Sequence, residues 1–333
     1  MIDPKVRRRA VQTLRARREK RENELIQRRA QIYRRIPRIA EIDAQLKTTM
    51  AELAAAAFRS GGDPVAAVEK VKQQNLMLQS ERAELLVGNG YPMDYLDDKP
   101  FCIRCGDTGR IGNRLCECFE ELCAQEQIKE LSNILDLDNQ SFDKFDFSWY
   151  SEKVEPSIGM SPRENISLNY DICLEYARKF KVYNSSIGRN LFLNGGTGLG
   201  KTFLSACIAG EVAKQGFSVV YDSAINIMDC YEAVRFGRDD AERTTSVKRF
   251  EECDLLIVDD LGTEMVTAFM LSALYSLVNT RLIKNLHTVI NSNLTMDEIR
   301  KRYTPQIVSR LEGEYTTLYF FGEDIRLLKR SRG

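Results

Sequence analysis

Short apolar runs that alternate with helical segments from residue 190 onward constrain this chain more than any other feature. In chain order, the apolar runs are NLFLNG, SVVYDS, DLLIVDD, HTVINSN and TTLYFFG, and helical sequence fills the intervals 201–215, 224–252, 267–284 and 295–312. Strands that are apolar throughout and are separated by helices form a parallel sheet covered on both faces. The sequence therefore predicts an α/β fold for this part of the chain.

The loop between the first strand and the first helix has the sequence GGTGLGKT. It fits the pattern G-x-x-x-x-G-K-[ST] at every fixed position. In a strand–loop–helix setting, such glycines let backbone N–H groups and the helix amino terminus surround the phosphates of a nucleotide. Lys201 would reach the β- and γ-phosphates, and the Thr202 hydroxyl would ligate Mg²⁺. The expected ATP-binding residues are Gly195, Gly196, Thr197, Gly198, Leu199, Gly200, Lys201 and Thr202.

Two adjacent carboxylates, Asp259 and Asp260, end the strand LLIVDD, the first of them 58 residues after Lys201. A buried strand can present acids only where it emerges, so both are expected beside the loop. Asp259 would hold Mg²⁺ through water, and Asp260 would polarise the water that attacks ATP. Helix capping is the structural alternative for Asp260, and Glu264 is an alternative base. The spacing favours the additional-strand class of P-loop ATPases over small kinases.

Five segments in a fixed order carry a family resemblance over about residues 140–333. They are NLFLNGGTGLGKTFLSACIA, DLLIVDDLGTE, HTVINSNL, IVSRLEGE and GEDIR. This set resembles the AAA+ superfamily and, within it, the helicase loaders of the DnaC/DnaI type and the related IstB transposition ATPases. The resemblance implies an AAA+ ATPase domain at 136–333. A full helical lid is not expected, because only about eleven residues follow TTLYFFG.

The same resemblance implies roles for three further residues. Asn293 matches the sensor-1 residue that orients the lytic water, with Asn291 as the fallback. Arg310 matches the arginine finger that enters the ATP site of a neighbouring subunit, which implies self-assembly, and Arg326 matches sensor 2. A planar, permanently charged guanidinium suits charge that grows on the γ-phosphate. A simple surface charge is the alternative for either arginine.

Two closely spaced cysteine pairs, Cys102-x-x-Cys105 and Cys116-x-Cys118, lie ten residues apart. Such pairs across a turn can converge on one tetrahedral Zn²⁺. The single histidine of the chain, His287, is distant in sequence, so we expect an all-cysteine site in a zinc module at 91–135. Cys123 is a spare ligand candidate, and buried free thiols or a redox pair are the alternatives. Loaders of the DnaI type carry a zinc module ahead of the ATPase, which agrees.

Residues 1–90 are expected to form an all-α hairpin or coiled coil. An apolar residue recurs every seven positions at Leu25, Ile32, Ile39, Leu46 and Leu53. Pro37 should kink or break the first helix, Gly61–Pro64 should form the turn, and the second helix should stop at Gly88. Residues 1–50 hold 15 Lys and Arg against 6 acids, whereas the whole chain has 48 of each. This basic region could attract nucleic acid or an acidic protein surface, or be a solvated helix face.

The apolar fraction of 43% and the charged fraction of 29% are those of a soluble globular protein. We expect no membrane span, because no run of about 18 apolar residues occurs. The Arg-rich start does not resemble a secretory signal. The sequence therefore predicts a cytoplasmic protein with reduced cysteines.

The resemblance, taken with these features, implies an ATP-dependent loader of the replicative DNA helicase. Residues 1–135 would bind a hexameric helicase, the AAA+ domain would bind ATP and single-stranded DNA, and slow, partner-regulated hydrolysis would act as a switch. The alternatives are an IstB-like helper that delivers a transposase to DNA, and an ATP-binding adaptor without hydrolysis. The expected cofactors are ATP, Mg²⁺ and Zn²⁺. Candidate DNA contacts are Lys248, Arg249, Arg235, Arg238, Lys329, Arg330 and Arg332.

Overall fold

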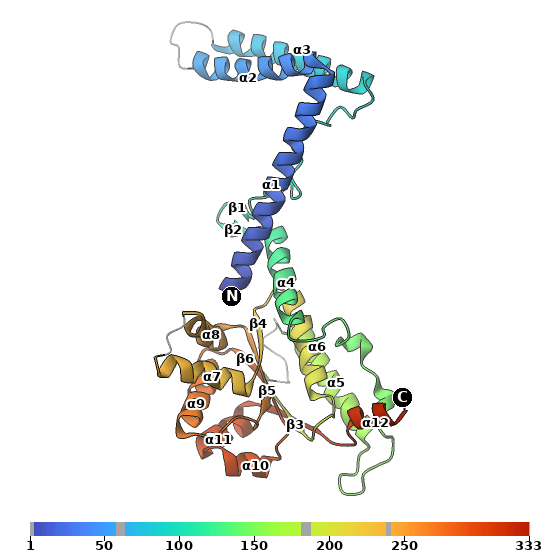
Figure 1. Cartoon of the computed structure of the whole chain (residues 1–333), viewed down its shortest axis with the longest axis vertical. Coiled ribbons are helices and arrows are strands. Elements are labelled where there is room, and N and C mark those ends of the chain that lie inside the picture. Colours follow the sequence, from blue (N-terminus) through green and yellow to red (C-terminus); the bar gives the residue numbers. More distant parts are fainter. Residues whose placement is uncertain (1–2, 58–63, 181–187, 238–240, 333) are drawn as a thin grey trace. The chain divides into compact units, whose positions relative to one another are not determined.

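A computed structural model describes residues 3–57, 64–180, 188–237 and 241–332 (Figure 1). The chain divides into two compact units. The sheet unit consists of Met1–Ala10 with Phe119–Gly333, and the hairpin unit consists of Val11–Cys118. The boundaries between these units lie inside two helices, whereas the sequence predicted domain boundaries at residues 90 and 135. The three domains expected from the sequence stay a prediction.

The sheet unit contains a five-stranded parallel sheet with the strand order β4-β5-β6-β3-β7. The strands are β3 (Asn190–Gly195), β4 (Val219–Ser223), β5 (Leu255–Leu261), β6 (His287–Ser292) and β7 (Thr316–Phe320). The predicted α/β class and all five predicted strands are confirmed. Strand β6 lies between β3 and β5, which is the additional strand that the spacing of the acids indicated. The carboxyl ends of these three strands therefore share one edge of the sheet.

Helices cover both faces of this sheet (Figure 1). The side chains of β5 alternate between the faces, so Leu255 and Ile257 pack with α5 and α6, whereas Leu256 and Val258 pack with α7, α9 and α11. The helices of the unit are α4 (Glu117–Ser132, which begins in the hairpin unit), α5 (Pro162–Arg178), α6 (Lys201–Lys214), α7 (Ala224–Arg235), α8 (Ala241–Glu252), α9 (Ala268–Ile283), α10 (Met296–Arg302), α11 (Pro305–Glu314) and α12 (Ile325–Arg332), with two 3-10 turns, Phe142–Lys144 and Phe147–Trp149.

Two intervals predicted as single helices are each divided in the structure. The segment 224–252 contains α7 and α8, and Gly237, with φ of +67°, follows the end of α7. The segment 295–312 contains α10 and α11, and Pro305 is the first residue of α11. A proline disfavours helical geometry in the residue before it, which explains that break. After β7, the described residues form the short helix α12.

The hairpin unit holds most of α1 (Pro4–Arg35), together with α2 (Pro37–Ala57), α3 (Pro64–Gly88) and the two-stranded β1 (Arg110–Ile111) and β2 (Arg114–Leu115). The predicted break at Pro37 and the stop at Gly88 are confirmed, whereas most of the predicted turn at 61–64 lies outside the described residues. Ile32 and Ile39 of the seven-residue pattern are fully buried and pack with Leu86. Among the described residues, no helix is both long and apolar enough to cross a membrane.

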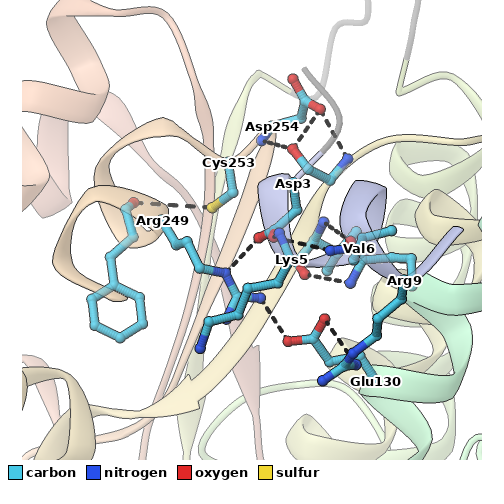
Figure 2. Close-up of polar contacts among 12 residues, drawn as sticks. Asp3, Lys5, Val6, Arg9, Glu130, Arg249, Cys253 and Asp254 are labelled. Atoms are coloured by element: carbon cyan, nitrogen blue, oxygen red, sulfur yellow. Dashed lines mark hydrogen bonds and ion pairs between the residues drawn. The ribbon is translucent and has the colours of Figure 1, made fainter. Parts of the chain in front are cut away.

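The first turns of α1 belong to the sheet unit and are fixed there by a buried ion-pair network (Figure 2). Asp3 caps the helix, because its Oδ1 accepts the backbone N–H of Lys5 at 2.7 Å. The other carboxylate oxygen pairs with Arg249 of α8, which also donates to Glu130 of α4 at 2.7 Å. Arg249, a candidate DNA contact from the sequence, is therefore held inside the unit by two acids. Val6 is buried on the same face of α1.

We predict that Asp3→Asn lowers the free energy of unfolding of the sheet unit by about 2 kcal/mol, because it removes a buried charged partner of Arg249 while Glu130 remains. Urea unfolding followed by the fluorescence of Trp149, the one tryptophan of the chain, measures this change. Asp297→Asn is the matched control, since its ion pair with Arg300 is exposed and should change stability by less than about 0.5 kcal/mol. Equal stability of the Asp3 variant and the parent would contradict a stabilising role of the network.

Candidate functional site

The glycine-rich loop runs from the end of β3 to the start of α6, as its sequence predicts. Gly198 and Gly200 have φ of +71° and +96°, where side chains are disfavoured. A Cβ on Gly198 would lie 1.9 Å from Asp324 Oδ1, and one on Gly200 would lie 2.4 Å from the Tyr150 hydroxyl. That hydroxyl donates to Leu199 O at 3.1 Å. The loop therefore takes its shape from two packed neighbours as well as from its own glycines.

Lys201 is buried inside the loop, with its ammonium fixed by three acceptors. The Nζ atom donates to Gly195 O and Gly196 O, both at 2.6 Å, and to Asn293 Oδ1 at 2.7 Å. Burial lowers the pKa of Lys201 to about 8, although the nearby Asp260 and Asp259 carboxylates act in the opposite direction. The lysine thus joins the loop to the end of β6 and carries a charge that is sensitive to pH.

The two acids at the end of β5 have different surroundings. Asp259 is buried, and its carboxylate accepts from the Tyr221 hydroxyl and from Asn291 Nδ2. Asp260 is exposed with φ of +55°, and the strand register shifts between Val258 and Leu261. This irregular backbone takes Asp260 out of the regular alternation of the strand. Asp260 accepts from Asn293 Nδ2 at 3.0 Å, so it is linked through Asn293 to Lys201.

A cavity of about 400 Å³ lies over the loop. The predicted residues that line it are Thr197, Gly198, Leu199, Gly200, Lys201, Thr202, Asp260, Asn293 and Arg326. The structure brings these residues together at the carboxyl edge of the sheet, and their roles stay predictions. A cavity of this size and mixed lining can hold a mononucleotide.

The aromatic wall of the cavity was not predicted. Phe145, Trp149 and Tyr150 line it, and Lys329 Nζ of α12 lies 5.4 Å from the centroid of the Trp149 ring. The density of aromatic residues in NQSFDKFDFSWY was the available signal. Flat aromatic rings suit a nucleobase, which offers a π face for stacking.

Arg310 lies at the opposite edge of the sheet from the loop. Its guanidinium donates to Asn279 Oδ1 at 2.7 Å and lies 5.5 Å from the centroid of the Tyr275 ring. It lines a second depression together with Asn190 and Thr316, which begin β3 and β7. The structure therefore does not bring Arg310 to the loop of its own chain, as a residue that serves a neighbouring subunit requires. Its role stays a prediction.

Two fallback residues lie outside the cavity lining. Glu264 is buried, and its carboxylate accepts from Gly262 N at 2.8 Å and from the Tyr303 hydroxyl. Asn291 is also buried and donates to Asp259 Oδ1 at 2.7 Å and to Ser205 Oγ at 2.9 Å. Their contacts hold the surrounding structure, whereas Asp260 and Asn293 face the cavity.

The four predicted zinc ligands form one cluster in the hairpin unit. The sulfurs of Cys102, Cys105, Cys116 and Cys118 all lie within 4.8 Å of one another. The Cys102–Cys116 and Cys105–Cys118 sulfur distances are 3.7 and 3.5 Å. Tetrahedral Zn²⁺ with bonds of about 2.3 Å places sulfurs about 3.8 Å apart, so the cluster fits this ion. Cys123 is buried in the other unit and lies outside the cluster.

Asp107 attaches this cysteine module to α1. Its carboxylate accepts from Cys102 N at 2.8 Å and pairs with the buried Arg21. The residue has φ of +60°, a conformation that Asp tolerates better than most side chains. The module is therefore built into the hairpin unit.

The fold and the site define a P-loop nucleotide-binding protein of the additional-strand class. The phosphate loop, the paired acids and the polar residue Asn293 occupy the ends of β3, β5 and β6, in the expected spatial order.

Comparison with known proteins finds similarity over part of the chain. Residues 184–311 match the family described as IstB-like ATP binding protein. The replicative helicase loader DnaI of Bacillus subtilis (strain 168) is 28% identical over 128 residues, or 37% of this chain and 40% of DnaI. An ATP-binding protein of insertion sequence IS1162 from Pseudomonas fluorescens is 30% identical over 73 residues, or 22% of this chain and 30% of that protein. Over the matched segment, the chain is similar to the DnaC/IstB-like family of AAA+ ATPases.

The chain spans less than half of the length of these two curated relatives. The crystal structure of the DnaI superposes with a TM-score of 0.43 and 20% identity, over 57% of this chain and 93% of that chain. The fold assignment rests on the strand order and the loop.

We predict that ATP binding takes up protons as the pH approaches the pKa of Lys201. Bound phosphates raise this pKa above its value of about 8 in the free protein, so binding near pH 8 should take up about half a proton, and binding near pH 6.5 almost none. Affinity should consequently fall as the pH rises from about 7 to 9. Titration calorimetry in buffers of different ionisation enthalpy measures this uptake. Lys201→Arg is the control, because guanidinium stays charged, and an equal uptake in both proteins would contradict the assignment.

Proposed function

We propose that this protein is an ATP-dependent loader of a hexameric replicative DNA helicase. The observation that carries the proposal is that Lys201, Thr202, Asp260 and Asn293 line one cavity in a chain that is similar to DnaI over 128 residues and also contains a four-cysteine cluster in its helical unit. Residues 1–135 would bind the helicase, and the AAA+ segment would bind ATP and single-stranded DNA. Hydrolysis would be slow and regulated by the partner, and would act as a switch.

The residues of the cavity suit ATP hydrolysis. Lys201 would bind the β- and γ-phosphates, and Thr202 and Asp259 would hold Mg²⁺, which supplies positive charge next to the phosphates. Asp260 would accept a hydrogen bond from the attacking water, and its contact with Asn293 orients the carboxylate. Arg326 lines the same cavity and would contact the γ-phosphate as sensor 2.

Single-stranded DNA would bind through exposed cations and aromatic surface. Arg235 and Lys248 are exposed, and Phe236, 65% exposed, follows Arg235 at the end of α7. Binding without sequence preference needs positive charge for the phosphates and flat rings for the bases, and this surface offers both. Arg238 lies outside the described residues.

A transposition helper is the second candidate, because the family match and the IS1162 relative both point to it. The hairpin unit and its cysteine cluster favour the loader, since IstB-type proteins are typically shorter at this end. Co-purification with a transposase, and not with a helicase, would favour the transposition helper. The third candidate is an adaptor that binds ATP without hydrolysis. It is less favoured, because Asp259, Asp260 and Asn293 would then have no catalytic role.

We predict that Lys201→Ala weakens ATP binding by about 100-fold, because it removes the buried cation that faces the phosphates. Asp260→Asn should bind ATP like the parent but hydrolyse it at least about 100-fold more slowly. Equilibrium binding of a fluorescent ATP analogue and steady-state phosphate release measure the two effects. Hydrolysis at the rate of the parent by both variants would contradict the assignment of the site.

We predict that Arg310→Ala loses ATP hydrolysis and regains it when mixed with Lys201→Ala. The reason is that Arg310 would act on the ATP of a neighbouring subunit, so a mixed assembly contains some intact sites. Phosphate release measured across mixing ratios tests this. Activity that never exceeds the sum of the two separate variants would make Arg310 a surface residue.

We predict about one zinc ion per chain, as the four-cysteine set binds one ion. Loss of zinc in the double variant Cys105→Ser/Cys116→Ser should abolish capture of a hexameric helicase by the full chain while ATP binding persists, because the cluster and the ATP site lie in different units. Elemental analysis and co-purification measure these outcomes. Less than about half a zinc per chain would exclude a structural zinc site, and helicase capture by the zinc-free variant would exclude a role of the zinc module in partner binding.

A further inference from the structure

Asp259 is a buried acid near the cavity whose two carboxylate oxygens both accept hydrogen bonds, and none of these donors belongs to the glycine-rich loop. With 8% of its surface exposed, it needs donors to compensate for its burial. Asn291 and the Tyr221 hydroxyl supply them, and Asp260 N adds a contact at 3.1 Å. The sequence predicts no role for Tyr221, and it indicates Asn291 only as an alternative to Asn293.

The two side-chain donors come from the strands on either side of β5. Tyr221 belongs to β4 and contacts Oδ2 of Asp259, whereas Asn291 belongs to β6 and contacts Oδ1. Because each carboxylate oxygen is held from a different side, the plane of the carboxylate is fixed. Substitution of either donor would leave one carboxylate oxygen without its side-chain donor, and the plane would be held less firmly.

Asn291 also connects Asp259 to the glycine-rich loop. Its Nδ2 lies 2.9 Å from Ser205 Oγ, and that hydroxyl donates to the backbone oxygen of Thr202 at 3.1 Å. Ser205 and Asn291 are both almost fully buried. A chain of buried hydrogen bonds thus joins Asp259 to Thr202, the two residues expected to hold Mg²⁺.

The donor set at this place fits Mg²⁺. A hydroxyl and a carboxylate are hard oxygen ligands of the kind that this ion prefers. The remaining acceptor, Asn291 Oδ1, is buried and finds no hydrogen-bond partner among the described residues. Water bound to a metal ion is a strong donor that would satisfy this atom.

We propose that Tyr221 and the pair Asn291–Ser205 are positioning residues for the Mg²⁺ of the bound nucleotide. They touch neither nucleotide nor metal and act by holding Asp259 at a fixed orientation and distance from Thr202. This inference rests on the proposed ATP-binding function, and it adds a defined group of residues outside the cavity to the metal site.

The test compares how the parent, Tyr221→Phe and Tyr176→Phe depend on Mg²⁺. Tyr176→Phe is the control, because it removes a similarly buried hydroxyl at the other end of the sheet. That hydroxyl donates to Arg189 O at 2.9 Å. Affinity for a fluorescent ADP is measured with EDTA and at increasing Mg²⁺, and Mn²⁺ binding to the nucleotide complex is followed by electron paramagnetic resonance. In Tyr221→Phe, nucleotide affinity in EDTA should match the parent, while half-saturation should require about 10-fold more metal. Tyr176→Phe should behave like the parent.

An unchanged metal requirement in Tyr221→Phe would overturn the proposal, as would an equal loss of affinity with and without metal. If Tyr221→Phe fails to fold, Ser205→Ala tests the same proposal, because Ser205 belongs to the chain of hydrogen bonds between Asp259 and Thr202. This variant should raise the metal requirement and leave nucleotide affinity in EDTA unchanged. An unaltered requirement in that variant would also overturn the proposal. A parent protein that binds no nucleotide at all would instead contradict the proposed function, so the two failures are distinguishable.

Discussion

The parallel register of β5, β6 and β3 is the constraint on which the site depends. Because the three strands run in the same direction and are hydrogen-bonded side by side, their carboxyl ends meet at one edge. The loop after β3, the acids that end β5 and the asparagines of β6 then lie within hydrogen-bonding distance of one another. Lys201 and Asn293 complete this arrangement, since a single pair of contacts links all three strand ends.

This arrangement explains why the two aspartates have different surroundings. A regular strand would direct neighbouring side chains to opposite faces of the sheet. The left-handed conformation of Asp260 changes that pattern, so Asp259 stays buried between β4 and β6 while Asp260 faces the cavity. The donors around Asp259 hold its carboxylate in place, which suits a metal ligand. Asp260 is suited to contact water.

The sequence predicted the sheet and the polar part of the site because these depend on local patterns. Apolar runs identify strands, and the loop motif has a fixed spacing within one strand–loop–helix segment. The cysteine pairs were similarly predictable, since both lie next to one short turn. By contrast, the Tyr221–Asp259 contact joins residues 38 positions apart, and nothing in the spacing marks Tyr221 as different from any other strand tyrosine.

The contact of Asp3 with Arg249 was also beyond sequence reasoning. It spans 246 positions, and Arg249 appeared as one cation among many until the structure showed two acids around it. The Asp-Pro pair at the start of α1 was a readable capping signal, but its second use as an ion-pair partner depends on tertiary packing. The same limit applies to Arg310, because a role in a neighbouring subunit depends on an assembly that one chain does not contain.

A crystal structure with a non-hydrolysable ATP analogue and Mg²⁺ tests the central claim most directly. We expect density for the triphosphate within the loop, with the β- and γ-phosphates at Lys201 and the metal between Thr202 and Asp259. Density for the nucleotide at any other place on the molecule, with the loop and the β5 acids unaltered, would contradict this account.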